Sequence, residues 1–315
     1  MNLIGVFPSH ISTFRQVYLG LKFTSKLIIP YMNSTVLEPA WQGKTQVVRN
    51  EVCSEAAARR VAAMLDLDPD GIVEGIPLPR GWQFILMGAD TRRSALRADG
   101  FPGLGVAMPD LGLPRLLLGE RTVSYRQEIP IGSRLLRTSA IESLRRKTSA
   151  TGPMATATIS HQLQLDGKNE PALVETQTYL LLPARNGPVT EDVTSHFEEI
   201  TAEKLKTVVP DETLLFQYSA LGFNSHKIHI DRSHARRVEG FPDLVMNGGL
   251  ATLLLTEFLR RDLGVSPTAI KLRHVAPLYC GRPLTLAADR KGANWHLKAY
   301  DHKHALAIDM EVDTQ

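Results

Sequence analysis

The chain has 315 residues, 43% hydrophobic and 22% charged, a composition ordinary for a globular protein and a length sufficient for two medium domains. Its 36 basic and 33 acidic residues leave a net charge of +3, which is too weak to indicate nucleic-acid binding. The sequence contains no run of 18 apolar residues, so we expect no membrane-spanning helix. Cys53 and Cys280 are isolated cysteines, a pattern that predicts no disulfide framework and a reducing compartment.

The N-terminal segment is unusual in its charge. The first 37 residues contain Arg15, Lys22 and Lys26 but no aspartate or glutamate, and they are rich in serine and threonine. A start of this kind is typical of a mitochondrial transit peptide. We therefore expect residues 1–40 to be a targeting or disordered leader and the protein to be mitochondrial, with an ordinary N-terminus and a cytoplasmic location as the alternative.

The first half of the chain begins with a helical pattern and continues with strands. Residues 45–67, TQVVRNEVCSEAAARRVAAMLDL, are alanine-rich with helical spacing, and the turn Asp68-Pro69-Asp70-Gly71 follows them. Segments 135–145, 155–165 and 173–182 alternate apolar and polar residues between turn clusters. They predict an antiparallel meander with one dry face.

A polar segment divides the two halves. Residues 185–203, RNGPVTEDVTSHFEEITAE, contain a Gly-Pro and few apolar residues, as domain linkers do. We place the linker at 191–204, between an N-terminal domain at 41–190 and a C-terminal domain at 205–315. Strands are expected in the second domain at 270–278, 284–288, 295–300 and 305–312.

An apolar helix is expected at about 248–262, ahead of those strands. Apolar residues recur there at helical spacing on so much of the surface that the helix must be buried on most sides: Leu250, Leu253, Leu254, Leu255, Phe258 and Leu259. Gly264 and Pro267 then end it. A sheet wrapped around one long helix would need this order of elements. The simpler interpretation is a core helix whose glycines only permit close packing.

A histidine-rich segment, Asn224 to Asp231, precedes the Gly248-Gly249 turn at the start of that helix. Free backbone N–H groups and the positive end of the helix dipole point away from such a start. An acid/base histidine beside an oxyanion donor suits chemistry at a thioester carbonyl or its α-carbon. The alternative is a set of solvated or structurally satisfied histidines.

The same segment resembles a metal cluster only superficially. His226, His229 and His234, together with Asp231, are residue types that bind zinc. However, the sequence shows neither paired cysteines nor a His-Glu-x-x-His motif. We expect no metal.

The runs SALGFNSHKIHID and EGFPDLVMNGGLATLLL resemble the signature region of the MaoC-like type 2 hydroxyacyl-thioester dehydratases. The resemblance is strongest to the double hot-dog branch that includes fungal mitochondrial dehydratases and mesaconyl-CoA hydratases. In the first half, similar family patterns fall on Lys147-Thr148, Gly152-Pro153 and Val174-Glu175-Thr176-Gln177. The similarity covers about residues 77–315.

This resemblance implies an α+β double hot-dog fold, in which two antiparallel sheets each wrap on a helix. Because the first half has no equally apolar helix, its active-site equipment is expected to be degenerate. The implied activity is that of a 3-hydroxyacyl-thioester dehydratase or (R)-specific enoyl-thioester hydratase on coenzyme A or acyl-carrier-protein thioesters. Water is the only reagent, so no cofactor is expected. One chain can be a complete pseudo-dimer, and a monomer or a homodimer is expected.

The resemblance also assigns site residues. Asn224 and His229 fall on the positions of the hydratase motif, and Gly248 falls on the expected oxyanion donor, so these three are the expected catalytic residues. His226, Asn247 and Gly249 are the expected substrate-binding residues. Four arginines beside this region are expected to be able to contact coenzyme A phosphates: Arg232, Arg236, Arg237 and Arg273.

The chain departs from the family at the helix entrance. The branch has Val-His-Gly-Pro-Leu where this chain has Met246-Asn247-Gly248-Gly249-Leu250. Asn247 does not titrate near neutral pH, and Gly249 loosens a turn that proline would stiffen. The alternative function is therefore a catalytically altered hot-dog protein, which binds acyl thioesters or acts as an isomerase or thioesterase.

Overall fold

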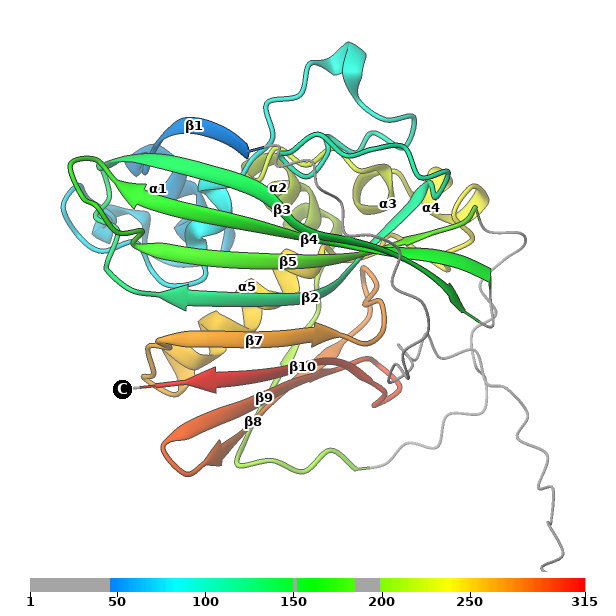
Figure 1. Cartoon of the computed structure of the whole chain (residues 1–315). Coiled ribbons are helices and arrows are strands. Elements are labelled where there is room, and N and C mark those ends of the chain that lie inside the picture. Colours follow the sequence, from blue (N-terminus) through cyan, green and yellow to red (C-terminus); the bar gives the residue numbers. More distant parts are fainter. Residues whose placement is uncertain (1–45, 150–151, 185–198, 315) are drawn as a thin grey trace, which may run out of the picture.

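The computed structural model describes residues 46–149, 152–184 and 199–314 (Figure 1). The leader expected at 1–40 lies outside these residues, as does most of the linker expected at 191–204. The helices are α1 (Glu55–Met64), α2 (Glu212–Leu221), α3 (Lys227–Ile230), α4 (Arg232–Arg237) and α5 (Gly248–Glu257). The short helical turns are η1 (Pro69–Gly71), η2 (Trp82–Leu86), η3 (Arg93–Ala95) and η4 (Phe258–Asp262).

The strands form one antiparallel sheet, in the order β1-β3-β4-β5-β2-β7-β10-β9-β8-β6. Those of the first half are β1 (Gln46–Val52), β2 (Arg115–Tyr125), β3 (Arg134–Ser149), β4 (Gly152–Leu165) and β5 (Leu173–Leu182). Those of the second half are β6 (Lys204–Val208), β7 (Ala269–His274), β8 (Leu284–Lys291), β9 (Asn294–Tyr300) and β10 (Leu306–Asp313). The strands expected from the alternating patterns are therefore confirmed, including the β3-β4-β5 meander.

The two halves of the sheet have the same strand order. Counted from its own edge, each half places its first strand outermost and its second strand at the centre. The halves join where β2 pairs with β7, between Glu120↔Arg273 and Ser124↔Ala269. Two sheets of identical order that wrap on helices form an α+β double hot-dog, so the predicted fold class is confirmed.

Helix α5 lies behind the central strands of this sheet (Figure 1). Seven of its ten residues are buried, and the helix continues into the π-helical turn η4. Gly264 follows with a φ of 67°, a left-handed conformation that suits glycine after a helix. The sequence prediction of a buried central helix at about 248–262 is confirmed.

The first half anchors α5 through Trp82 of η2. Its side chain is fully buried, and its indole Nε1 donates a hydrogen bond of 2.8 Å to Glu257 Oε1. Arg260 also donates to Glu257, at 2.6 Å, so the carboxylate is paired although it is 5% exposed. Side chains of both halves join in one hydrophobic cluster, which includes Trp82, Val123, Leu250 and Leu272. The two halves therefore share a core.

The prediction for residues 45–67 is partly wrong. Only Glu55–Met64 is helical, while Gln46–Val52 forms the edge strand β1 paired with β3. The pairing allows one face of the strand to be half-buried, as its alternating exposure shows. Three valines favour an extended chain there. Ser54 then caps α1 by accepting a hydrogen bond from the Ala57 amide.

Two further findings concern the membrane and the thiols. None of the helices in the described ranges is long and apolar enough to span a membrane. Cys53 and Cys280 are both buried free thiols.

The anchoring of α5 predicts a difference between two tryptophans. We expect Trp82→Ala to lower the free energy of unfolding by about 3 to 5 kcal/mol, because it empties a buried site and removes a partner of Glu257. Trp295→Ala, on the half-buried surface of β9, is the matched control and should cost less than about 2 kcal/mol. Urea unfolding measures both, and equal losses would contradict the anchoring role.

Candidate active site

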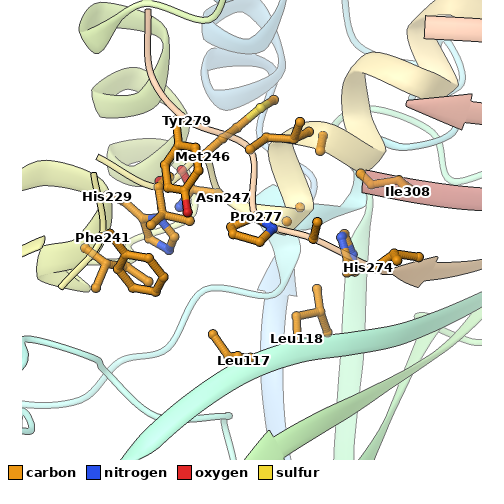
Figure 2. A pocket seen from close by; sticks show the side chains of 18 of the residues that line it. Leu117, Leu118, His229, Phe241, Met246, Asn247, His274, Pro277, Tyr279 and Ile308 are labelled. Carbon is orange, nitrogen blue, oxygen red and sulfur yellow. The ribbon is translucent and has the colours of Figure 1, made fainter. Parts of the chain in front are cut away.

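A cavity of about 400 Å³ lies where the two halves meet. Strand β2 of the first half contributes Leu117 and Leu118 to its wall. Figure 2 shows these leucines across the cavity from His229 and Asn247 of the second half. Every expected site residue lines this one cavity: His229, Asn224, Gly248, His226, Asn247 and Gly249. The structure therefore brings together residues that are up to 25 positions apart in the sequence.

His229 is held in one tautomer. It lies on α3 and is 8% exposed, and its Nδ1 is 2.7 Å from the carbonyl oxygen of Val245. Since a carbonyl only accepts, Nδ1 must carry the proton, and Nε2 of the neutral ring has a free lone pair. Burial lowers the pKa of His229 to about 4. The ring is therefore neutral at pH 7 and able to accept a proton at Nε2.

The position of this imidazole is fixed by backbone as well as side-chain bonds. The Val245 amide donates to the carbonyl of Ile228, at 2.9 Å, while the Val245 carbonyl accepts from His229. Val245 precedes the start of α5 by three residues. The acid/base ring and the helix start are therefore tied to the same short stretch of chain.

Asn224 presents a donor to the cavity. Its Oδ1 accepts a hydrogen bond of 3.1 Å from the backbone amide of His226. Its Nδ2 makes no hydrogen bond with the described residues. An amide that is fixed through its oxygen leaves two N–H donors available for a substrate or water oxygen.

His226 packs beside the acid/base ring. The two imidazoles meet edge to face, with centroids 5.4 Å apart, and Nε2 of His226 is 3.6 Å from Asp99 Oδ2. Burial, followed by the neighbouring His229, lowers the pKa of His226 well below its usual range. His226 is therefore neutral at pH 7 and adds no positive charge beside His229.

Both glycines at the start of α5 are closely packed. A β-carbon on Gly248 would lie 3.0 Å from His274 Cε1, and one on Gly249 would lie 2.1 Å from the Tyr218 hydroxyl. The Tyr218 hydroxyl thus occupies the space that the β-carbon of a proline would need at position 249. The amides of both glycines are among the first helical N–H groups, which have no partner within the helix.

Asn247 is buried at 3% exposure and takes the N-cap position of α5, yet its side chain does not cap that helix. It lies 3.3 to 3.4 Å from the Ser219 hydroxyl of α2. These bonds are long, so they tie Asn247 to α2 only weakly.

The sequence analysis missed several polar cavity residues, among them Arg121, Tyr218 and His274. His274 is half-buried, and its Nε2 atom is buried without a hydrogen-bond partner among the described residues. Burial, followed by Arg121, lowers its pKa to about 3. Strand alternation offered a signal, because His274 continues the inward side of Ile270 and Leu272. Arg121 likewise shares the inward side of Val123.

Asp231, which lies among the three histidines, has a structural role. This carboxylate caps α4 by accepting a hydrogen bond of 2.9 Å from the His234 amide. Within the described residues, no group of three or more histidine, cysteine, aspartate or glutamate side chains is placed to hold a metal ion.

The four arginines expected near coenzyme A phosphates do not line the cavity: Arg232, Arg236, Arg237 and Arg273. Arg232 and Arg236 form ion pairs with Asp243, and Arg273 forms one with Asp309. The arginines that do line the cavity are Arg115, Arg121 and Arg282.

The fold is a paired antiparallel hot-dog with a neutral imidazole near the start of its central helix. The family model for hydroxyacyl-thioester dehydratase type 2 matches residues 81–280, more than half of the chain, and the chain belongs to this family.

Individual relatives agree with this assignment. The mesaconyl-C(4)-CoA hydratase of Chloroflexus aurantiacus is 29% identical over 276 residues, which cover 87% of this chain and 96% of that protein. The mitochondrial hydroxyacyl-thioester dehydratase type 2 of Schizosaccharomyces pombe is 29% identical over 89 residues, 27% of this chain and 30% of that protein. The structure of a MaoC-like dehydratase from Phytophthora capsici covers 86% of this chain and 96% of its own, with a TM-score of 0.63 and 13% identity. That last likeness supports the fold.

The packing at Gly249 predicts that two substitutions compensate. Gly249→Ala should lower the free energy of unfolding by about 1 to 3 kcal/mol, because the new methyl displaces the Tyr218 hydroxyl. Adding Tyr218→Phe removes that atom, so the double variant should recover part of the loss. Gly71→Ala, with no atom within 4 Å of its β-carbon, is the control. An effect of Gly249→Ala as small as the control's would show that this packing is not restrictive.

The pKa of His229 predicts a pH-dependent stability. The folded value of about 4 lies below the ordinary 6.5, so the unfolded chain binds more protons between these values. The stability is complete above pH 6.5 and falls as the pH drops towards 4, by on the order of 3 kcal/mol. In His229→Asn this contribution is absent, and the unfolding free energy should fall less between pH 7 and 4. Parallel curves for the two proteins would contradict the low pKa.

Proposed function

We propose that the chain catalyses the reversible hydration of an enoyl thioester to an (R)-3-hydroxyacyl thioester. The observation that carries this proposal is the His229–Val245 hydrogen bond, which directs the proton of the ring to Nδ1 and leaves Nε2 as a base. Membership of the hydroxyacyl-thioester dehydratase type 2 family supports the same reaction.

In the direction of dehydration, Nε2 of His229 takes the α-proton of the hydroxyacyl group. The electron pair left on the α-carbon delocalises into the thioester carbonyl as an enolate. As the enolate collapses, the bond from the β-carbon to oxygen breaks and the hydroxyl leaves with the proton from Nε2 as water. One imidazole thus serves both proton transfers on one face of the substrate, and it ends in its starting state. General acid/base catalysis of this kind contributes about 10² to 10⁴-fold in rate.

Asn224 and Gly248 complete the proposed catalytic set. The free Nδ2 of Asn224 would donate to the departing hydroxyl or the attacking water, since its Oδ1 is already bonded to His226. The Gly248 amide at the start of α5 would donate to the enolate oxygen, and one such donor is typically worth about 3 to 4 kcal/mol. His226, Asn247 and Gly249 line the same cavity and would form its substrate-binding wall.

Coenzyme A is the proposed carrier, because the Chloroflexus relative is named as a hydratase of a coenzyme A thioester. Acyl carrier protein is the alternative carrier. The reaction needs no cofactor, since water is the only co-substrate. The shared core of the two halves allows a single chain to contain a complete site, either as a monomer or within a homodimer.

We also propose the domain boundaries and the cellular location from the sequence. We keep the domain boundaries at 41–190 and 205–315, with a linker at 191–204 and a leader at 1–40. The acid-poor composition of the first 37 residues and the mitochondrial relative support a mitochondrial location and a role in fatty acid metabolism, and a cytoplasmic location remains the alternative.

The proposal predicts a selective loss of activity. Wild-type protein should hydrate crotonyl-CoA, which is measured as the loss of the absorbance of the α,β-unsaturated thioester. His229→Ala should lower kcat by about 10²-fold or more. Asn224→Ala should lower it by about tenfold. His304→Asn is the control, because His304 is an exposed turn residue with a φ of 58°, a conformation that asparagine tolerates.

Other outcomes of this assay distinguish the alternatives. An inert wild-type protein that still binds acyl-CoA would favour a binding protein. A product of unchanged mass would indicate an isomerase, and release of free coenzyme A would indicate a thioesterase. Full activity of His229→Ala would exclude the proposed mechanism.

A further inference from the structure

His274 is an imidazole of the cavity that the proposed reaction does not use. It ends β7 on the inward side of the sheet and lines the same cavity as His229. Figure 2 shows the two rings on different sides of the pocket. The His274 ring is half-buried, but its Nε2 atom is buried and has no hydrogen-bond partner among the described residues. Because an unpaired buried polar atom is costly, Nε2 points to a ligand atom or a water at this place.

This nitrogen lies beside the start of α5. A β-carbon built on Gly248 would lie 3.0 Å from Cε1 and 3.3 Å from Nε2 of the His274 ring. Gly248 is the first residue of α5, so its amide is one of the N–H groups without a partner inside the helix. The missing side chain of Gly248 leaves room for a small atom between the helix start and the ring. Two polar groups thus border one small region of the cavity.

The His274 ring is neutral, yet it is able to donate. Burial, followed by Arg121, lowers its pKa to about 3, so the ring carries one N–H at pH 7. Nδ1 is not among the buried atoms that lack a partner, and it makes no hydrogen bond with a described residue, so water reaches it and can donate to its lone pair. A carbonyl oxygen only accepts, and beside Nε2 it selects the tautomer with the proton on that nitrogen.

The surroundings favour negative charge beside this ring. Arg121 is 9% exposed and lines the same cavity, and it pairs opposite Leu272 in the sheet, two residues from His274. Its Nε lies 3.2 Å from Glu175, but the charge that acts on the His274 ring is that of the guanidinium. The positive end of the α5 dipole adds to this field. An enolate oxygen gains more from such surroundings than a neutral carbonyl does, which is the property required of a catalytic donor.

We propose that His274 donates a second hydrogen bond to the thioester oxygen, beside the Gly248 amide. This inference rests on the proposed hydratase function. When His229 removes the α-proton, the electron pair of that C–H bond moves to the thioester oxygen, and it returns when the bond from the β-carbon to oxygen breaks. His274 keeps its proton throughout and only stabilises the oxygen while it is charged. It is therefore a catalytic residue of a different kind from His229.

Two amide variants of His274 differ in reach alone. The side-chain nitrogen of glutamine falls near the position of imidazole Nε2, whereas that of asparagine falls near Nδ1. His274→Gln should hydrate crotonyl-CoA with a kcat within about fivefold of wild type, whereas His274→Asn should lower kcat by about 10²-fold with little change in KM. Equal kcat values for these two variants would overturn the inference.

The control for these variants is His296→Asn. His296 is a half-buried histidine of the neighbouring strand region, on β9, and it does not line the cavity. Its partner Asp309 keeps an ion pair with Arg273 when the imidazole is removed. The kcat of His296→Asn should therefore stay at the wild-type value, and a loss equal to that of His274→Asn would show that the effect is not specific to the cavity.

Infrared spectroscopy of a bound thioester gives a readout that a merely structural role would not change. Butyryl-CoA labelled with carbon-13 at its carbonyl has no double bond to hydrate, and each hydrogen bond to that carbonyl lowers its stretching frequency. The frequency should be lower in wild type and His274→Gln than in His274→Asn. Tyr218→Phe, which removes a hydroxyl that also borders the start of α5, should leave it unchanged. A shift that is lost in Tyr218→Phe and kept in His274→Asn would assign the donor to Tyr218 and overturn the inference.

The same spectra separate this inference from the proposed function. If wild-type protein binds butyryl-CoA but hydrates no enoyl thioester, the proposed function fails, while the spectra still decide whether His274 contacts the carbonyl. If crotonyl-CoA is hydrated but wild type and His274→Asn show the same carbonyl frequency, only the second donor is wrong. Wild-type protein that neither hydrates crotonyl-CoA nor binds butyryl-CoA would overturn both.

Discussion

The hydrogen bond from His229 Nδ1 to the Val245 carbonyl is the interaction on which the site depends. It selects one tautomer of a buried imidazole, and burial keeps that imidazole neutral, so the ring can act as a base at Nε2. The same peptide stretch leads into α5, whose first two residues line the same cavity. Losing this bond would both free the ring and change the tautomer that makes it a base.

The two halves of the double hot-dog contribute different parts of the site. The second half supplies the proposed catalytic residues, while the first supplies an anchor for α5 in Trp82 and a wall in β2. Because β2 and β7 pair at the centre of the sheet, inward side chains of both halves reach one space. Arg121 enters the site in this way. The first half therefore contributes part of the cavity wall even without an apolar helix of its own.

The sequence supports some of these features better than others. The α5 helix and most strands follow from periodicity, since burial on one face leaves a regular pattern. The edge strand β1 was missed because its valines adjoin the alanine-rich helix α1, and pairing with β3 decided the outcome. The contact between Tyr218 and Gly249 could not be predicted, because it joins residues through tertiary packing alone. Arg121 could have been suspected as a charged residue on the inward side of a strand.

The most direct test of the central claim is the protonation state of His229 in the folded protein. Nitrogen-15 NMR of the histidine side chains, with His229→Asn used for assignment, reports which ring nitrogen carries the proton. We predict a protonated Nδ1 and an unprotonated Nε2 at pH 7, with titration only near pH 4. A proton on Nε2, or titration of this ring near pH 6.5, would contradict the account.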